Sequence, residues 1–127
     1  MVTNLVSITP SEHVVFDSRR LRSLCAEYGV RGAEAVVMDA VEDISGSLFV
    51  IETACRRDRV SEIPATARHV SQMAAEIGML SLARVARDLG IVAQRGDIVA
   101  CRAIWARVVR IGDQSLAKVW QAPGLSM

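Results

Sequence analysis

The chain has 127 residues, of which 51% are hydrophobic and 23% are charged, and its formal net charge at pH 7 is +1. This length suits a single domain, and the near-zero charge excludes the strongly basic surface by which proteins bind nucleic acids or acidic membranes. Charged residues recur too often for a membrane span of about 18 apolar residues, and residues 1–10 lack the pattern of a secretion signal, so a cytoplasmic protein is expected.

The mean hydropathy of +0.29 is high for a small domain, which predicts an apolar patch left over for a partner. The three cysteines, Cys25, Cys55 and Cys101, are odd in number and form no C-x-x-C pair. Disulfides and a zinc site are therefore not expected. Cys55 and Cys101 continue helical apolar stripes, and we interpret them as small core residues.

The N-terminal part predicts an extended lead-in over residues 1–15 and then a short helix over 18–28. Asp17 is a favourable N-cap for this helix, and Gly29 is a favourable residue to end it. His13 lies in the lead-in, which has no periodicity, and is interpreted as a tail residue.

The longest predicted helix covers residues 32–57. Its apolar residues recur every three or four positions and share one face: Val37, Val41, Ile44, Leu48, Ile51 and Cys55. Gly46 lies inside this helix at a cost of about 1 kcal/mol relative to alanine, which a long packed helix can absorb. Asp58 and Ser61 mark the turn that follows.

Three further helices are predicted over residues 61–77, 80–94 and 98–120. Pro64 is acceptable because it lies in the first turn of its helix, Gly78 ends that helix, and Gly96 and Asp97 cap the last one. The apolar positions continue in steps of three and four: Ala67, Val70, Ala74, Ile77, Leu82, Val85, Leu89, Val92, Cys101, Ile104, Val108 and Ile111.

Short turns between four long helices require each helix to run antiparallel to its neighbours. The sequence therefore predicts an all-α, up-and-down four-helix bundle with a short N-terminal helix capping one end. This bundle domain is expected over residues 16–122, followed by a tail over 123–127. The residues expected to be buried are Val41, Ile44, Leu48, Ile51, Val70, Ala74, Ile77, Leu82, Val85, Leu89, Ile104 and Val108.

The helix over 61–77 carries a recognisable run. From Ala67 to Gly78 it reads A-R-H-V-S-Q-M-A-A-E-I-G, and Leu82, Ala86, Leu89 and a Gly-Asp turn follow. Over about residues 16–120 the chain resembles the histidine-containing phosphotransfer (Hpt) domain of bacterial multistep phosphorelays. That family has the motif A-H-x-L-K-G-x-A, then small residues ending in L-G. The resemblance implies a two-component signalling module whose partner is a response-regulator receiver domain or a hybrid histidine kinase.

Three residues depart from the family motif. Arg68 occupies the place of the phospho-acceptor histidine, Ser71 that of a lysine, and Gln72 that of a glycine. A guanidinium that stays protonated cannot attack an aspartyl phosphate, a serine supplies no charge to the phosphoryl group, and a glutamine fills the space for its approach. We therefore expect a pseudo-Hpt domain that binds a response regulator without accepting its phosphoryl group, and no catalytic residue.

The exposed side of this helix is the expected partner-binding site, comprising Arg68, His69, Ser71, Gln72 and Ala75. His69 is an alternative acceptor, but using it shifts the helix by one residue. That shift would turn Val70 and Ala74 outward, although they belong to the apolar face, here called the apolar ladder, that the steps of three and four define. A solvated surface histidine is the preferred interpretation.

No enzyme motif competes with this interpretation. The chain has no Ser-His-Asp or Cys-His arrangement with supporting context, no glycine loop for phosphate and no Glu-x-x-His pair. We expect no enzyme, no cofactor, no metal site, and a monomer or weak homodimer. The alternatives to an Hpt-like module that docks receivers are a helical adaptor or dimerisation protein outside phosphorelays, and phosphotransfer through His69.

Overall fold

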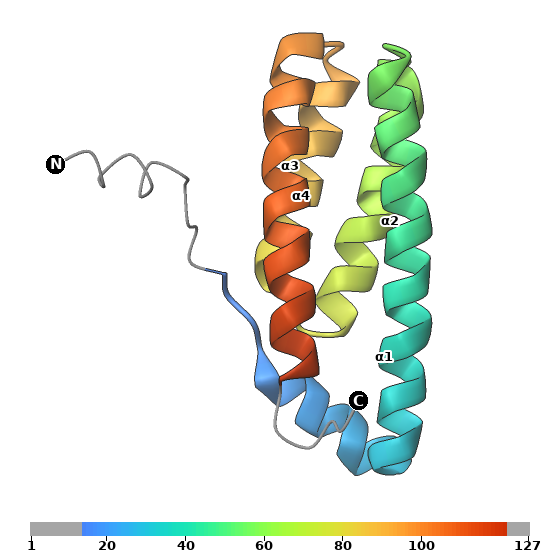
Figure 1. The fold of residues 1–127 in the computed structure, drawn as a ribbon, viewed down its shortest axis with the longest axis vertical. Coiled ribbons are helices and arrows are strands. Elements are labelled where there is room, and N and C mark those ends of the chain that lie inside the picture. Colours follow the sequence, from blue (N-terminus) through green and yellow to red (C-terminus); the bar gives the residue numbers. More distant parts are fainter. Residues whose placement is uncertain (1–13, 122–127) are drawn as a thin grey trace, which may run out of the picture.

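The computed structural model describes residues 14–121, which form a bundle of helices (Figure 1). The elements are α1 (Ser18–Arg56), the 3-10 turn η2 (Val60–Glu62), α2 (Ile63–Glu76), α3 (Leu80–Gln94) and α4 (Ile98–Trp120). The predicted all-α, up-and-down bundle is confirmed. Within residues 14–121 the extended pairing is limited to one isolated bridge between Phe16 and Met79. No helix in this range is both long enough and apolar enough to cross a membrane.

α1 consists of two helical parts that meet at Gly29. This glycine has φ +77° and ψ 169°, which are not helical values, and the chain changes direction there. The part before Gly29 crosses the lower end of the bundle in Figure 1, and the longer part runs along it. The short capping helix that was predicted to end at Gly29 is therefore confirmed.

The remaining boundaries follow the local signals in the sequence. α3 and α4 have the predicted bounds, and Asp97 caps α4 by accepting a hydrogen bond from the backbone N–H of Ala100 at 3.0 Å. The helix predicted over 61–77 begins instead with the 3-10 turn, and regular α2 starts at Ile63 with Pro64 in its first turn. The helix predicted to end at Arg57 ends at Arg56.

The residues just before α1 are attached to the turn between α2 and α3. The backbone N–H of Asp17 donates to the carbonyl oxygen of Gly78 at 2.8 Å, and that of Val15 donates to Ser81 Oγ at 2.7 Å. Gly78 has φ +85°, and a Cβ there would lie 2.5 Å from the Asp17 carbonyl oxygen. A side chain at this position would therefore clash with the residues just before α1 and separate them from the turn. Residues 1–13, including His13, and residues 122–127 lie outside the described range.

The core is one cluster along the bundle axis. Most residues expected to be buried are buried: Ile44, Ile51, Val70, Ala74, Ile77, Leu82, Val85, Leu89 and Val108. The expectation was wrong for Val41, Leu48 and Ile104, which are half-buried against the core. All three belong to α1 or α4, and these two helices approach each other at few points, so side chains along them keep contact with water.

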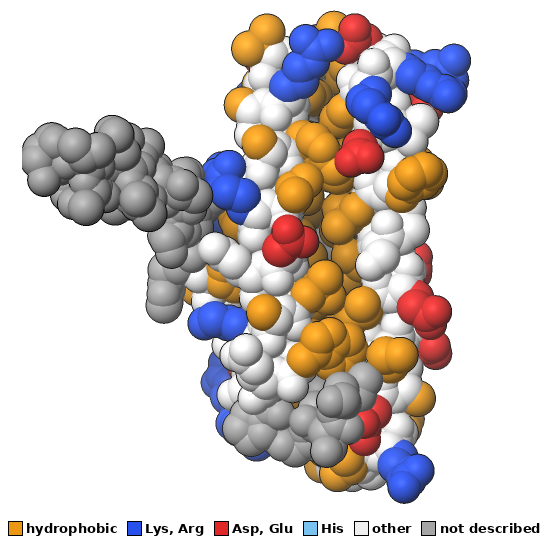
Figure 2. All heavy atoms as spheres, in the orientation of Figure 1, with side chains coloured by type: hydrophobic (Ala, Val, Ile, Leu, Met, Phe, Trp, Pro, Cys, Tyr) orange, Lys and Arg blue, Asp and Glu red, His pale blue; other side chains and the backbone are white. Residues whose placement is uncertain are grey.

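The four helices are not equally close. α2 and α3 pack most closely, and a Cβ at Gly90 of α3 would lie 3.5 Å from the Cβ of Ala67. Between α1 and α4 the surface is hollowed and lined with hydrophobic side chains (Figure 2). In Figure 1, α2 and α3 lie behind α1 and α4, so the bundle has a tight side and an open side.

Candidate functional site

The expected partner-binding residues occupy two sides of α2. Arg68, Gln72 and Ala75 are exposed, whereas His69 and Ser71 are half-buried. Because Ala67, Val70 and Ala74 are buried, the core fixes the rotation of α2 about its axis. Arg68 therefore points away from the core, as the apolar ladder predicted.

Arg68 lies at a hollow between α2 and α3 with a volume of about 170 Å³. Its α2 wall is formed by Pro64, Arg68, Ser71 and Gln72, and its α3 wall by Arg87, Gly90, Ile91 and Gln94. Two guanidinium groups and no carboxylate line this hollow, so its local potential is positive.

Arg87 is not among the site residues predicted from the sequence, in which α3 stands out only by its apolar stripe. The signal available is that Arg87 and Ile91 lie one turn apart, on the side of α3 that faces away from Leu89. Only the antiparallel packing of α3 against α2 brings Arg87 to the same hollow as Arg68.

The side chain of Ser71 connects α2 to α3. Its Oγ donates a hydrogen bond of 2.7 Å to the carbonyl oxygen of Ala83 on α3, in a partly buried position. The hydroxyl therefore links the two helices beneath the hollow.

His69 faces the other way, toward α1. Its Nε2 lies 2.9 Å from Oδ2 of Asp43, and both side chains are partly exposed. Nε2 is thus occupied by its contact with the Asp43 carboxylate and is not free to attack a phosphoryl group in this arrangement. The Asp43 carboxylate also repels an approaching phosphoryl group. His69 is thus separated from the arginine hollow and engaged with α1.

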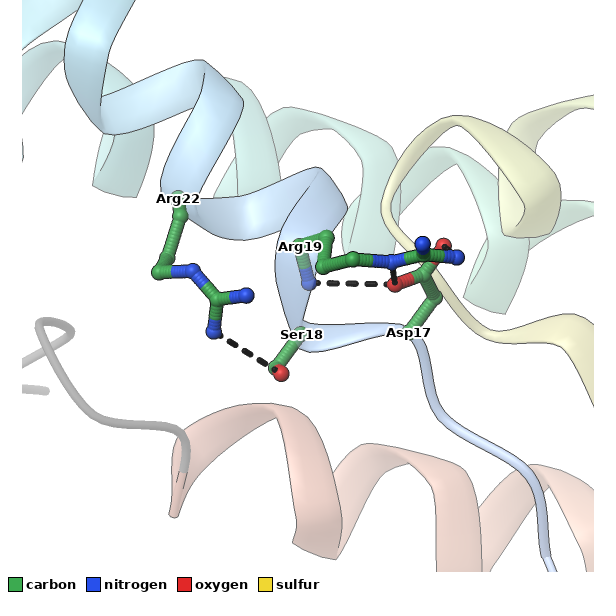
Figure 3. A network of polar contacts seen from close by, with 4 residues as sticks. All are labelled: Asp17, Ser18, Arg19 and Arg22. Atoms are coloured by element: carbon green, nitrogen blue, oxygen red, sulfur yellow. Dashed lines mark hydrogen bonds and ion pairs between the residues drawn. The ribbon is translucent and has the colours of Figure 1, made fainter.

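A second group of polar residues gathers where α1 begins, and its contacts are structural (Figure 3). The Asp17 carboxylate accepts hydrogen bonds from the backbone N–H of Arg19 at 3.0 Å and from Arg19 Nε at 3.1 Å. Arg22 donates to Ser18 Oγ at 3.2 Å. The hydrogen bond from the Arg19 side chain lowers the pKa of Asp17. This cluster caps the helix and lies outside the hollow.

The cysteines belong to the core. Cys101 is buried, Cys25 and Cys55 are half-buried against the core, and all three are free. Burial raises the pKa of the Cys55 and Cys101 thiols, which keeps them protonated near neutral pH. Over residues 14–121, no three His, Cys, Asp or Glu side chains gather closely enough to hold a metal ion.

No protein family model matches the sequence, and no curated protein matches it. Among solved structures, the crystal structure of histidine-containing phosphotransfer protein B (HptB) from Pseudomonas aeruginosa PAO1 is similar to this chain, with a TM-score of 0.77. The match covers 84% of this chain and 91% of that chain, at 20% sequence identity. At this identity the similarity shows the fold. The Hpt-like bundle predicted from the sequence is therefore confirmed.

Proposed function

We propose that this chain is an Hpt-like signalling module that docks receiver domains in a cytoplasmic two-component phosphorelay without accepting a phosphoryl group. The receiver would belong to a response regulator or to a hybrid histidine kinase. The observation that carries the proposal is the position of Arg68: it occupies the acceptor place of the motif, on an Hpt fold, at a hollow that it shares with Arg87.

Each part of the altered motif argues for binding without transfer. Arg68 remains protonated and cannot act as a nucleophile. Ser71 is engaged with the carbonyl oxygen of Ala83, and Gln72 lines the space where a phosphoryl group would approach. The alternative acceptor, His69, is hydrogen bonded to Asp43 on another side of α2.

The charge of the hollow suits the phosphorylated form of a receiver. An aspartyl phosphate is a dianion, and a guanidinium can bind two of its oxygens at once. Arg68 and Arg87 together supply two such groups without a competing carboxylate in the hollow. We expect the phosphorylated receiver to bind more tightly than the unphosphorylated one.

The test is a binding and transfer assay with a panel of receiver domains, each with and without an aspartyl phosphate. Arg68→Ala should weaken binding of the phosphorylated receiver by roughly tenfold, whereas Arg31→Ala, an exposed arginine on α1, should leave it unchanged. No label should pass from a radiolabelled receiver to this chain. A stable label that disappears on His69→Ala would contradict the proposal and favour transfer through His69.

Restoring the family motif gives a second test. A triple variant, Arg68→His with Ser71→Lys and Gln72→Gly, should accept a phosphoryl group from a receiver that binds the natural chain. Ser71→Lys alone is the necessary control, because it removes the bond to Ala83 and its effect on folding must be known. A folded triple variant that accepts label from no receiver would count against a phosphorelay role.

The second candidate function is a helical adaptor or dimerisation protein. It is favoured by the hydrophobic side chains that remain exposed between α1 and α4. Failure of every receiver to bind, with dimerisation intact, would favour this alternative.

A further inference from the structure

An apolar surface runs along the open side of the bundle. On α1 it contains Met38, Val41, Leu48 and Phe49, and on α4 it contains Trp105, Val109, Leu116 and Trp120. We call these eight residues the α1–α4 face. Phe49 is 65% exposed, Met38 44% and Val109 42%. Figure 2 shows hydrophobic side chains gathered in the furrow between the two helices.

Within residues 14–121, the two helices that border this furrow make few contacts with each other. One of the points at which they approach is Gly112 of α4, where an added Cβ would lie 4.0 Å from Leu48 Cδ1. Contiguous apolar surface of this kind is unusual on a small monomer and marks a protein interface.

The charges on α1 identify a partner. Glu42, Phe49 and Arg56 follow one another at intervals of seven residues, which is two helical turns, so they lie on one exposed stripe. Phe49 is the midpoint, with an acid two turns before it and a base two turns after it. A second copy of the same stripe, laid antiparallel across it, places each Arg56 opposite the other copy's Glu42.

We infer that the α1–α4 face binds the α1–α4 face of a second copy of this chain, with the two α1 helices antiparallel and crossing at Phe49. Such an interface is isologous: a twofold axis passes beside Phe49, and every contact occurs twice. The two Phe49 side chains and the bulky residues of both furrows lose contact with water, and the Glu42 and Arg56 pairs set the register.

Local details of α1 agree with this arrangement. Arg56 has one ion pair within its own helix, to Glu52, but the two atoms are 3.9 Å apart and both side chains are exposed, so that pair holds it weakly. Ser45 and Gly46 precede Phe49, and nothing lies within 4 Å of where a Cβ of Gly46 would be. A helix of the partner therefore has room to approach the backbone beside Phe49.

Self-association through the α1–α4 face is independent of receiver docking. The arginine hollow is lined by α2 and α3, the two helices that lie behind α1 and α4 in Figure 1, and it shares no residue with the α1–α4 face. Self-association and receiver binding can thus fail separately.

The first experiment measures the mass of the full chain by analytical ultracentrifugation from low micromolar concentration up to the solubility limit. We expect a monomer–dimer equilibrium. Phe49→Asp should weaken it by roughly tenfold or more. The matched control is Val99→Asp, since Val99 is 78% exposed on α4 outside the face and should leave the equilibrium unchanged. Circular dichroism checks that both variants fold.

The second experiment tests the register. Glu42→Arg alone and Arg56→Glu alone each place two like-charged pairs in the dimer, and each should weaken it by roughly threefold to tenfold. An equimolar mixture of the two variants restores both opposite-charge pairs and should recover a heterodimer. Failure of the mixture to recover would overturn the proposed register. A natural chain that stays monomeric at every concentration would overturn the proposal and leave the face to a different protein.

Discussion

The α2–α3 and α1–α4 pairs are both antiparallel neighbours in one bundle, yet they pack very differently. Where α2 meets α3 the side chains are small, with Ala67 against Gly90, and the helices come close together. Along α1 and α4 the side chains are large, including Leu48 and Trp105, and the helices stay apart. The separation of packed helices follows the size of the side chains between them. The close pair carries a polar hollow, and the separated pair exposes apolar surface.

The largest effect should come from forcing the close pair apart. Ala67→Leu adds three carbons to a fully buried site opposite Gly90, and overpacking of this kind costs about 1–3 kcal/mol of the free energy of unfolding. Urea unfolding measures the cost. Ala65→Leu is the control, because Ala65 is exposed on the same helix and should change stability by less than about 0.5 kcal/mol. Equal costs at the two positions would mean that α2 and α3 are not in close contact.

A smaller effect is expected from the hydrogen bond that joins the close pair. Ser71→Ala removes the donor to the Ala83 carbonyl oxygen and should lower the free energy of unfolding by about 1 kcal/mol. Ser23→Ala, at an exposed position on α1, controls for the better helix propensity of alanine. If Ser71→Ala proves no worse than Ser23→Ala in urea unfolding, the bond does not contribute to stability.

Two glycines allow a direct comparison of the pairs. Gly112→Ala should raise the free energy of unfolding by about 0.5–1 kcal/mol, because alanine favours the helix and its Cβ would meet nothing closer than 4.0 Å. Gly90→Ala should gain less, since its Cβ would lie 3.5 Å from that of Ala67. Thermal unfolding of the two variants under identical conditions checks the order. A larger gain at Gly90 would contradict the difference in packing.

The smallest effect is a pH dependence that reports whether the core beside α4 is dry. Burial, and secondarily Cys101, raises the pKa of the Cys55 thiol in the folded chain. The stability that this thiol contributes is therefore complete below the unfolded pKa of about 8.5 and is lost as the pH rises through the folded pKa. Cys55→Ala should flatten the fall in stability above that pH, and Cys25→Ala serves as the comparison. An unchanged pH profile in Cys55→Ala would mean that water reaches this thiol.

The sequence alone was sufficient for features that local chemistry determines. Asp17 and Asp97 each cap a helix where predicted, and Gly29 breaks α1, since capping and backbone conformation depend on neighbouring residues. The three-four spacing identified the buried ladder of α2 because one face of that helix is packed along its whole length.

What the sequence did not provide depends on how helices pair. The bond between His69 and Asp43 joins residues 26 positions apart, and Arg87 reaches the hollow of Arg68 because α3 packs closely against α2. The half-burial of Leu48 has the same origin: periodicity shows which side of a helix is apolar, but not how near the neighbouring helix comes.

The opposite placement of the arginine hollow and the α1–α4 face has a consequence for valency. A dimer joined through the α1–α4 faces would carry two arginine hollows, each lined by the helices on the far side of its own bundle. A single receiver would bind no more tightly because of the second hollow. Two receivers held together in one assembly would bind more tightly, because the first contact raises the local concentration of the second receiver. The affinity for such a partner would then rise steeply with its oligomeric state.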